Sequence, residues 1–213
     1  MKIAILGTGD VGSNLGSKII ELGHEVKMGS RSSEKARKWA KSHGQNASGG
    51  SFADAASFGE IVFNCTAGAG SLEALKMAGS KNLGGKILID VSNPLDFSRG
   101  MPPTLTISNT DSLGEQIQRE FPSTRVVKAL NMVAHNLHTN PGLVKGEHDL
   151  FICGNDETAK ARATEILMAW FGWKNVIDLG DITACRGMEM FLPLWVRIAM
   201  RNNFASFNIK IVK

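Results

Sequence analysis

The sequence predicts an α/β fold with a mostly parallel sheet, and three observations support this prediction. Short apolar runs of strand length alternate with helical patterns along nearly all of the 213 residues. These runs are apolar throughout, which is typical of strands that are buried on both faces. A glycine-rich turn joins the first run to the first helical pattern. Together these features indicate strand–helix–strand units whose sheet is covered by helices on both sides.

The predicted elements follow one another in regular order. We expect strands at 2–6, 25–29, 61–65, 86–91, 125–130, 149–153 and 175–179. Helical patterns occupy the intervals, at about 10–22, 33–43, 71–79, 112–121 and 156–172. Because the parallel strands of one sheet need crossover connections, this alternation predicts a doubly wound sheet.

The last segment departs from this alternation. Residues 185–204 form one helix candidate that is apolar on most of its circumference, and Pro193 is expected to kink it. Such a helix is either part of the core, a subunit interface or the wall of a ligand pocket. We therefore expect a main domain over residues 1–180, with residues 181–213 as a C-terminal helix and tail that complete the same domain.

Composition limits the classes of function. The net charge is +4, and the basic residues are scattered without interleaved aromatic residues, so a small anionic ligand is favoured over nucleic acid. Cys65, Cys153 and Cys185 have neither disulfide nor zinc-site spacing, which is typical of a reducing compartment. No segment approaches the roughly 18 apolar residues of a membrane span. We expect a cytoplasmic protein without a metal site.

The glycine turn carries the first functional signal. Gly7, Gly9 and Gly12 have GxGxxG spacing, directly after a strand and at the start of a helix. In this context the first glycine permits a tight turn, the second admits a pyrophosphate and the third allows close packing of helix and strand. The motif predicts a Rossmann-type dinucleotide-binding domain; the alternative is a tight turn that binds no ligand. We interpret Asp10 as a helix cap that points away from the phosphate.

The end of the second predicted strand indicates which dinucleotide is bound. Proteins that bind NAD place an acidic residue there, whereas this chain has Ser30 and Arg31, with Lys35 about one turn later. An arginine fork, a hydroxyl and an ammonium group suit the 2′-phosphate of NADP(H) and would not repel it. Alternatively, Ser32 or Ser33 caps the second helix and Arg31 is only solvated.

Further motifs extend these signals to the C-terminus. With "DVSNPL" (90–95), "VVKALN" (126–131) and "NIKIV" (208–212), the chain resembles the NADP oxidoreductases that depend on the deazaflavin coenzyme F-420 (F420), and the cytosolic reductase domains of the STEAP metalloreductases. The resemblance implies a Rossmann-type domain with a short C-terminal extension, often as a homodimer. It also implies an enzyme that transfers hydride directly between the nicotinamide of NADP(H) and a deazaflavin or a flavin such as FMN or FAD.

The resemblance also implies roles for individual residues. Hydride transfer needs two rings held at the right separation and no protein acid or base, so we expect positioning residues only. The implied contacts are Thr8, Gly9, Asp10 and Val11 at the pyrophosphate, Ser30, Arg31 and Lys35 at the 2′-phosphate, Thr66 and Ala67 along the adenosine and its ribose, Asn93 and Pro94 at a strand end, and Ala129, Asn131 and Met132 at the nicotinamide.

One departure from the family pattern concerns the hydride acceptor. Deazaflavin-dependent members typically have histidine where this chain has Asn131, and "KALN" resembles the flavin- and metal-reducing branch. His135 and His138 either meet the second ring or stabilise a loop, and we favour the loop. Two other functions fit the same fold. One is an NADP(H)-binding redox sensor without turnover, and the other is a reductase of a small carbonyl or imine compound.

Overall fold

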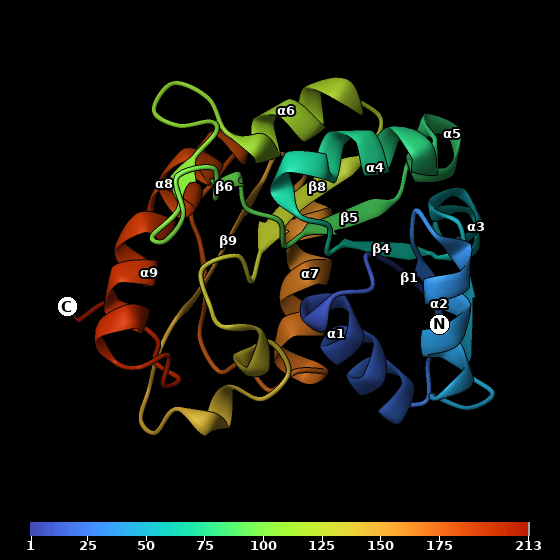
Figure 1. Cartoon of the computed structure of the whole chain (residues 1–213), viewed down its shortest axis with the longest axis horizontal. Coiled ribbons are helices and arrows are strands. Elements are labelled where there is room, and N and C mark those ends of the chain that lie inside the picture. Colours follow the sequence, from blue (N-terminus) through green and yellow to red (C-terminus); the bar gives the residue numbers. More distant parts are fainter. Residues whose placement is uncertain (213) are drawn as a thin grey trace.

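The computed structural model describes residues 1–212 and contains an eight-stranded sheet with helices on both faces (Figure 1). The strands of this sheet are β1 (Lys2–Leu6), β2 (Glu25–Gly29), β3 (Ala47–Gly50), β4 (Ile61–Asn64), β5 (Ile87–Asp90), β8 (Arg125–Ala129), β9 (Leu150–Gly154) and β10 (Val176–Asp178). The α-helices are α1 (Asp10–Glu21), α2 (Ser33–Lys41), α3 (Phe52–Phe58), α4 (Ser71–Ala78), α5 (Ser80–Leu83), α6 (Leu113–Glu120), α7 (Glu157–Ala169), α8 (Cys185–Met190) and α9 (Leu192–Arg201). A separate two-stranded antiparallel hairpin consists of β6 (Leu95–Asp96) and β7 (Thr104–Leu105).

The strand order of the large sheet is β10-β9-β8-β5-β4-β1-β2-β3. Neighbouring strands are parallel except for β8 and β9, which confirms the predicted mostly parallel, doubly wound sheet. The chain builds β2 and β3 on one side of β1 and then crosses to β4 on the other side. In sheets of this kind, ligands bind where the order reverses, at the carboxyl ends of the strands. The topology therefore predicts a ligand site at the carboxyl ends of β1 and β4.

The core consists of one apolar cluster on each face of the sheet. Along β1, Ile3 and Ile5 belong to the cluster that packs against α1, α2 and α7, whereas Ala4 and Leu6 belong to the cluster under α3, α4, α6 and α8. Side chains alternate across a strand, so a strand that is buried on both faces is apolar at most of its positions. This confirms the inference drawn from the uniformly apolar strands.

Several elements of the N-terminal half were not predicted: β3, α3, the short helix α5 and the hairpin strands β6 and β7. β3 has the sequence ASGG, which carries no strand pattern, and α3 follows it directly. A Cβ atom on Gly49 would lie 2.3 Å from the carbonyl oxygen of Ala36, so β3 packs too close to α2 for a side chain there. The start of α3 has a local signal, because the Ser51 hydroxyl accepts from the Asp54 backbone N–H and the Asp54 carboxylate accepts from the Ser51 backbone N–H.

The C-terminal helix is interrupted near the predicted position. The expected kink at Pro193 appears as a break at Phe191 that separates α8 from α9, with Pro193 at the second position of α9. Proline has no backbone N–H with which to continue the hydrogen bonding of α8. Beyond α9 the chain returns to β9, where the backbone N–H of Asp149 donates to the carbonyl of Ile209 at 2.9 Å. No helix within residues 1–212 is long and apolar enough to span a membrane.

Candidate functional site

A pocket of about 590 Å³ lies at the carboxyl ends of β1, β2 and β4. It contains eight of the residues predicted from the sequence: Gly7, Thr8, Gly9, Ser30, Arg31, Lys35, Thr66 and Ala67. The remaining lining residues were not predicted: Ser32, Phe52, Cys65, Gly70, Glu73, Ala74 and Met77. Ser32 and Cys65 directly adjoin predicted residues, whereas Phe52 and the residues of α4 reach the pocket only through the packing of α3 and α4.

The three motif glycines have different structural causes. Gly7 has a positive φ of 119°, and a Cβ atom there would lie 2.6 Å from the carbonyl oxygen of Cys65. A Cβ atom on Gly12 would lie 2.1 Å from the carbonyl oxygen of Gly7. Both positions therefore need glycine so that β1, α1 and β4 can pack together. A Cβ atom on Gly9 would meet no atom of the described chain within 4 Å. The fold itself does not need glycine there, so its absent side chain leaves space for a ligand.

The N-terminus of α1 is open toward this space. Gly9 is the N-cap residue, and within residues 1–212 no side chain accepts from the first N–H groups of the helix. The prediction that Asp10 caps the helix is wrong, because the extended cap conformation belongs to Gly9 and Asp10 is already the first helical residue. Its side chain is exposed. Free N–H groups and the positive end of the helix dipole favour an anion such as a pyrophosphate.

The pocket is cationic where α2 begins. Ser30 is buried, whereas Arg31 and Lys35 are exposed and form no ion pair with another residue in the described chain. Ser32 is the N-cap residue of α2, but its hydroxyl makes no capping hydrogen bond there. The alternative interpretation, in which the Ser32 hydroxyl caps α2, is therefore not supported, because the capping hydrogen bond is absent at Ser32. Two cations and two hydroxyl groups are available to one anionic group, such as a phosphate.

The residues expected at the nicotinamide lie outside this pocket, in β8 and at its end, and those expected at a strand end follow β5. Asn93 and Asn131 are joined by two hydrogen bonds, from Asn93 Nδ2 to the Asn131 carbonyl at 2.8 Å and from Asn131 Nδ2 to Asn93 Oδ1 at 3.0 Å. A Cβ atom on Gly68 would lie 1.8 Å from the Asn93 carbonyl oxygen, so the loop after Thr66 and Ala67 packs directly against Asn93 and Pro94.

The side chains of the remaining two candidates face the core. Ala129 is fully buried in β8, and Met132 packs against the cluster under α6 and α8.

His138 has the expected loop role, since its ring lies 3.2 Å from the Val133 carbonyl and its own carbonyl accepts from the Trp173 indole at 3.1 Å. Burial lowers the pKa of His138 to about 4, which keeps the ring neutral. His135 is exposed.

A buried ionic network lies beneath these strand ends and was not predicted. Lys128 Nζ is 2.7 Å from Asp90 and 2.8 Å from Glu189, and all three side chains are almost completely buried. Burial alone would lower the pKa of Lys128, but the attraction of Asp90 and Glu189 outweighs it and raises the pKa above its ordinary value. Glu189 also accepts from the backbone N–H groups of Leu113 and Gly114, at the start of α6. The network thus ties α8 to two strands and to α6.

This network continues to the pocket beside the glycine turn. Asn64, at the end of β4, donates to Asp90 and to Ser71, each at 2.7 Å, and its side-chain oxygen accepts from the Thr66 hydroxyl at 2.7 Å. The sequence contains a signal for this ion pair, because Asp90 and Lys128 are charged residues within otherwise apolar runs. Charged groups are rarely fully buried unless they are paired, so two of them in neighbouring buried strands indicate an ion pair.

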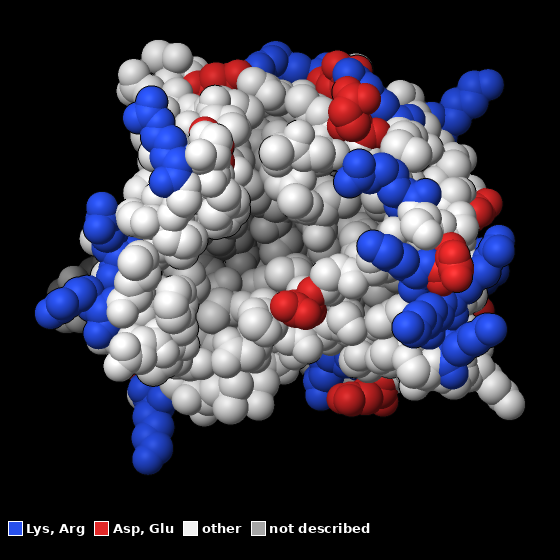
Figure 2. All heavy atoms as spheres, in the orientation of Figure 1, with Lys and Arg blue, Asp and Glu red and all other residues white. Residues whose placement is uncertain are grey.

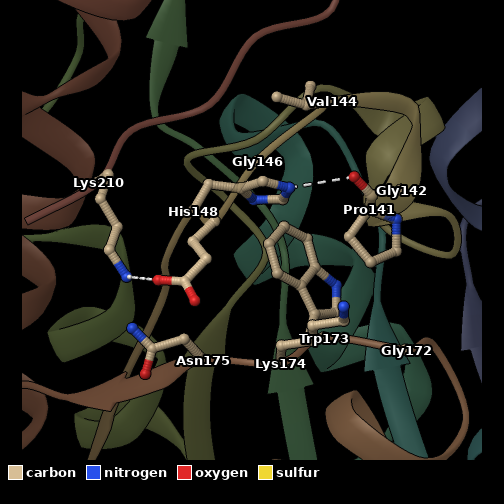
Figure 3. Close-up of a pocket in the computed structure, with 11 residues that line it drawn as sticks. Pro141, Gly142, Val144, Gly146, His148, Gly172, Trp173, Lys174, Asn175 and Lys210 are labelled. Carbon is tan, nitrogen blue, oxygen red and sulfur yellow. Dashed lines mark hydrogen bonds and ion pairs between the residues drawn. The ribbon is translucent and has the colours of Figure 1, made fainter.

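A second pocket, of about 400 Å³, lies at the opposite edge of the sheet, where β9 and β10 begin (Figure 3). Two of its polar side chains have partners within the pocket, since His148 lies 3.1 Å from the Pro141 carbonyl and Lys210 lies 3.3 Å from Glu147 (Figure 3). Trp173 forms part of its wall. The residues predicted to bind a dinucleotide lie in the other pocket, beside the glycine turn.

Comparisons with known proteins agree with this geometry. A family model described as NADP oxidoreductase, coenzyme F420-dependent, matches residues 2–94. Metalloreductase STEAP3 of Rattus norvegicus is 30% identical over 200 residues, which are 91% of this chain but only 38% of that longer protein. A crystal structure from Arthrobacter sp. FB24, described as a candidate F420-dependent NADP-reductase, has 48% identity and a TM-score of 0.95, with both chains covered in full.

The F420-dependent NADP reductase of Methanothermobacter marburgensis is similar over its whole length. It is 30% identical over 226 residues, and the alignment covers 99% of this chain and 98% of that protein. These matches confirm the resemblance inferred from the motifs. The chain belongs to the family of coenzyme F420-dependent NADP oxidoreductases.

Proposed function

We propose that this protein transfers hydride directly between the nicotinamide of NADP(H) and the ring of a deazaflavin or flavin. The family is one of NADP oxidoreductases, which supports a redox reaction with NADP(H). The observation that carries the proposal is the pocket beside Gly9, which combines an open helix N-terminus with the unpaired cations Arg31 and Lys35 of the described chain.

In this proposal the pocket orients the dinucleotide through its phosphates. The backbone N–H groups at Thr8, Gly9, Asp10 and Val11 hold the pyrophosphate, and Arg31, Lys35 and Ser30 hold the 2′-phosphate. The loop at Thr66 and Ala67 runs along the adenosine. A fixed position at both phosphates directs the other end of the molecule across the ends of β4 and β5.

The nicotinamide end lies at Asn93, Pro94, Asn131 and Met132. The paired amides of Asn93 and Asn131 hold the loops after β5 and β8 together, while the network around Lys128 anchors them from below. NADPH, when bound, supplies the hydride, and the protein contributes a rigid surface that holds one ring against the other. This role needs no protein acid or base, which agrees with the uncharged character of the site.

The first experiment is anaerobic oxidation of NADPH by the purified protein in the presence of F420, FMN, FAD or riboflavin, with NADH as the control. Turnover with F420 alone would place the protein with the deazaflavin-dependent reductases, whereas turnover with flavins would identify a flavin reductase, as Asn131 suggests. NADPH binding without reduction of any acceptor would contradict the proposal and favour a redox sensor.

The choice of NADP(H) over NAD(H) has its own test. Arg31→Ala is expected to weaken NADPH binding by about tenfold and to leave NADH binding nearly unchanged, because only NADPH carries the 2′-phosphate. Arg37→Ala is the matched control, since Arg37 is an exposed arginine of α2 outside the pocket. Equal losses of NADPH and NADH affinity in Arg31→Ala would contradict the role of this side chain.

A further inference from the structure

A third pocket, of about 590 Å³, lies between the loop that connects β6 to β7 and the start of α9. Its rim carries two arginines, Arg99 from the loop and Arg197 from α9, and Pro193 forms part of its wall. In Figure 1, β6, α8 and α9 lie on one side of the molecule, and α2 lies on the other. Figure 2 shows a deep hollow between these sides that is lined almost entirely by uncharged residues.

Both walls of this pocket are attached to the nicotinamide end of the proposed site. The hairpin begins directly after Asn93 and Pro94, and the backbone N–H of Thr106 donates back to the Pro94 carbonyl at 2.8 Å. The other wall, α9, directly follows α8, in which the Met188 carbonyl accepts from Asn131 Nδ2 at 3.2 Å. Both segments that form the pocket are therefore connected along the chain to elements bound to the proposed nicotinamide end.

Two other arginines of this region are paired with carboxylates: Arg119 lies 2.8 Å from Asp111, and Arg186 lies 2.5 Å from Glu115. Arg99 and Arg197 are exposed and have no ion-pair partner among residues 1–212. Unpaired cations therefore line two pockets of the described chain: Arg31 and Lys35 the pocket beside the glycine turn, and Arg99 and Arg197 the third pocket.

We propose that Arg99 and Arg197 bind an anionic group, a phosphate or a carboxylate, on the side chain of the hydride-accepting molecule. The proposal rests on the proposed function, because that function makes the occupant of the hollow a ring-bearing acceptor. The uncharged hollow suits the ring, and guanidinium groups suit phosphate and carboxylate oxygens. Acceptors that carry such a group are thereby preferred over acceptors that lack it.

FMN and riboflavin are suitable probes because they differ only in one phosphate. Their binding to the protein in the presence of NADP⁺ is measured by quenching of flavin fluorescence. We expect the wild type to bind FMN about tenfold more tightly than riboflavin. Arg197→Ala should weaken FMN binding about fivefold, since the contact is exposed to solvent, and should leave riboflavin binding unchanged. Arg197→Lys should retain part of the preference for FMN.

Arg201→Ala is the matched control, because Arg201 is an exposed arginine of α9 that does not line the pocket. It should bind FMN like the wild type. Equal affinities of the wild type for FMN and riboflavin, or equal losses in Arg197→Ala and Arg201→Ala, would overturn the inference. Binding is measured without turnover, so the two proposals fail separately. Failure to reduce any acceptor contradicts only the proposed function, whereas loss of the FMN preference contradicts only the anion pocket.

Discussion

Gly9→Ala separates the two roles of the glycine motif, which are close packing within the fold and space for a pyrophosphate. Gly9 has a φ of −77° and a ψ of −177°, an extended conformation that alanine adopts without strain. The added methyl group meets no atom of the described chain within 4 Å, so only the preference of the N-cap position changes. We expect the free energy of unfolding to fall by about 1 kcal/mol or less. The same methyl group occupies the space through which a pyrophosphate approaches the backbone.

The expected effect of Gly9→Ala on the ligand is larger than its effect on the fold. Loss of a single hydrogen bond to a charged group corresponds to about 1.5–3 kcal/mol, so NADPH affinity should fall at least about tenfold. Titration followed by NADPH fluorescence measures the affinity, and urea unfolding measures the stability.

Gly12→Ala is the control for Gly9→Ala. Its methyl group would lie 2.1 Å from the Gly7 carbonyl oxygen, and we expect a loss of about 3 kcal/mol of stability. Unchanged NADPH affinity in Gly9→Ala, or a loss of stability as large as that in Gly12→Ala, would refute the separation of roles.

Two further predictions concern buried charges. Glu189→Ala should lower the free energy of unfolding by about 3–5 kcal/mol, because Lys128 loses a buried partner and two N–H groups at the start of α6 lose their acceptor. Urea unfolding measures this loss, and a change below about 1 kcal/mol would show that the network contributes little to stability. The second prediction concerns His138, whose native pKa is about 4, below the ordinary value near 6.5. Between pH 6.5 and pH 4 the unfolded chain binds a proton at this residue that the native chain does not, so the free energy of unfolding falls as the pH is lowered. Between pH 7 and pH 5 His138 should account for a loss of about 2 kcal/mol in the free energy of unfolding, and His138→Gln should remove this part of the pH dependence. If urea unfolding gives the same pH dependence for the wild type and for His138→Gln, other groups cause it.

Local patterns alone predicted much of the architecture. The predicted strands at 2–6 and 25–29 coincide with β1 and β2, and the other predicted strands and helices differ from the observed ones by one to three residues at their ends. Strand and helix patterns depend on the period of apolar residues, which is a local property. The glycine motif and the Ser30-Arg31 pair are local as well, because a turn and the two residues after a strand are adjacent in the chain. The sequence therefore predicted, without the structure, eight of the residues that line the pocket beside the glycine turn.

Tertiary structure decided which distant residues share a site. β3 was missed because its glycines allow close packing, Gly49 against α2 and Gly50 against Asp54 of α3, and no periodic pattern records such contacts. The antiparallel direction of β9 also leaves no local signal. Lys128 and Glu189 are separated by 61 positions in the sequence, and their contact depends on how α8 packs against the sheet.

The same reason applies to the pocket that holds Arg99 and Arg197. Its two walls come from segments nearly a hundred residues apart, and α9 follows α8, which is bound to Asn131 and to the buried network. The sequence by itself determined most of the strands and helices, the family and the residues that gather beside the glycine turn, since each of these is encoded in short contiguous stretches. The buried charges and the arginine-rimmed pocket were decided by the folded chain, because packing alone brings their residues together.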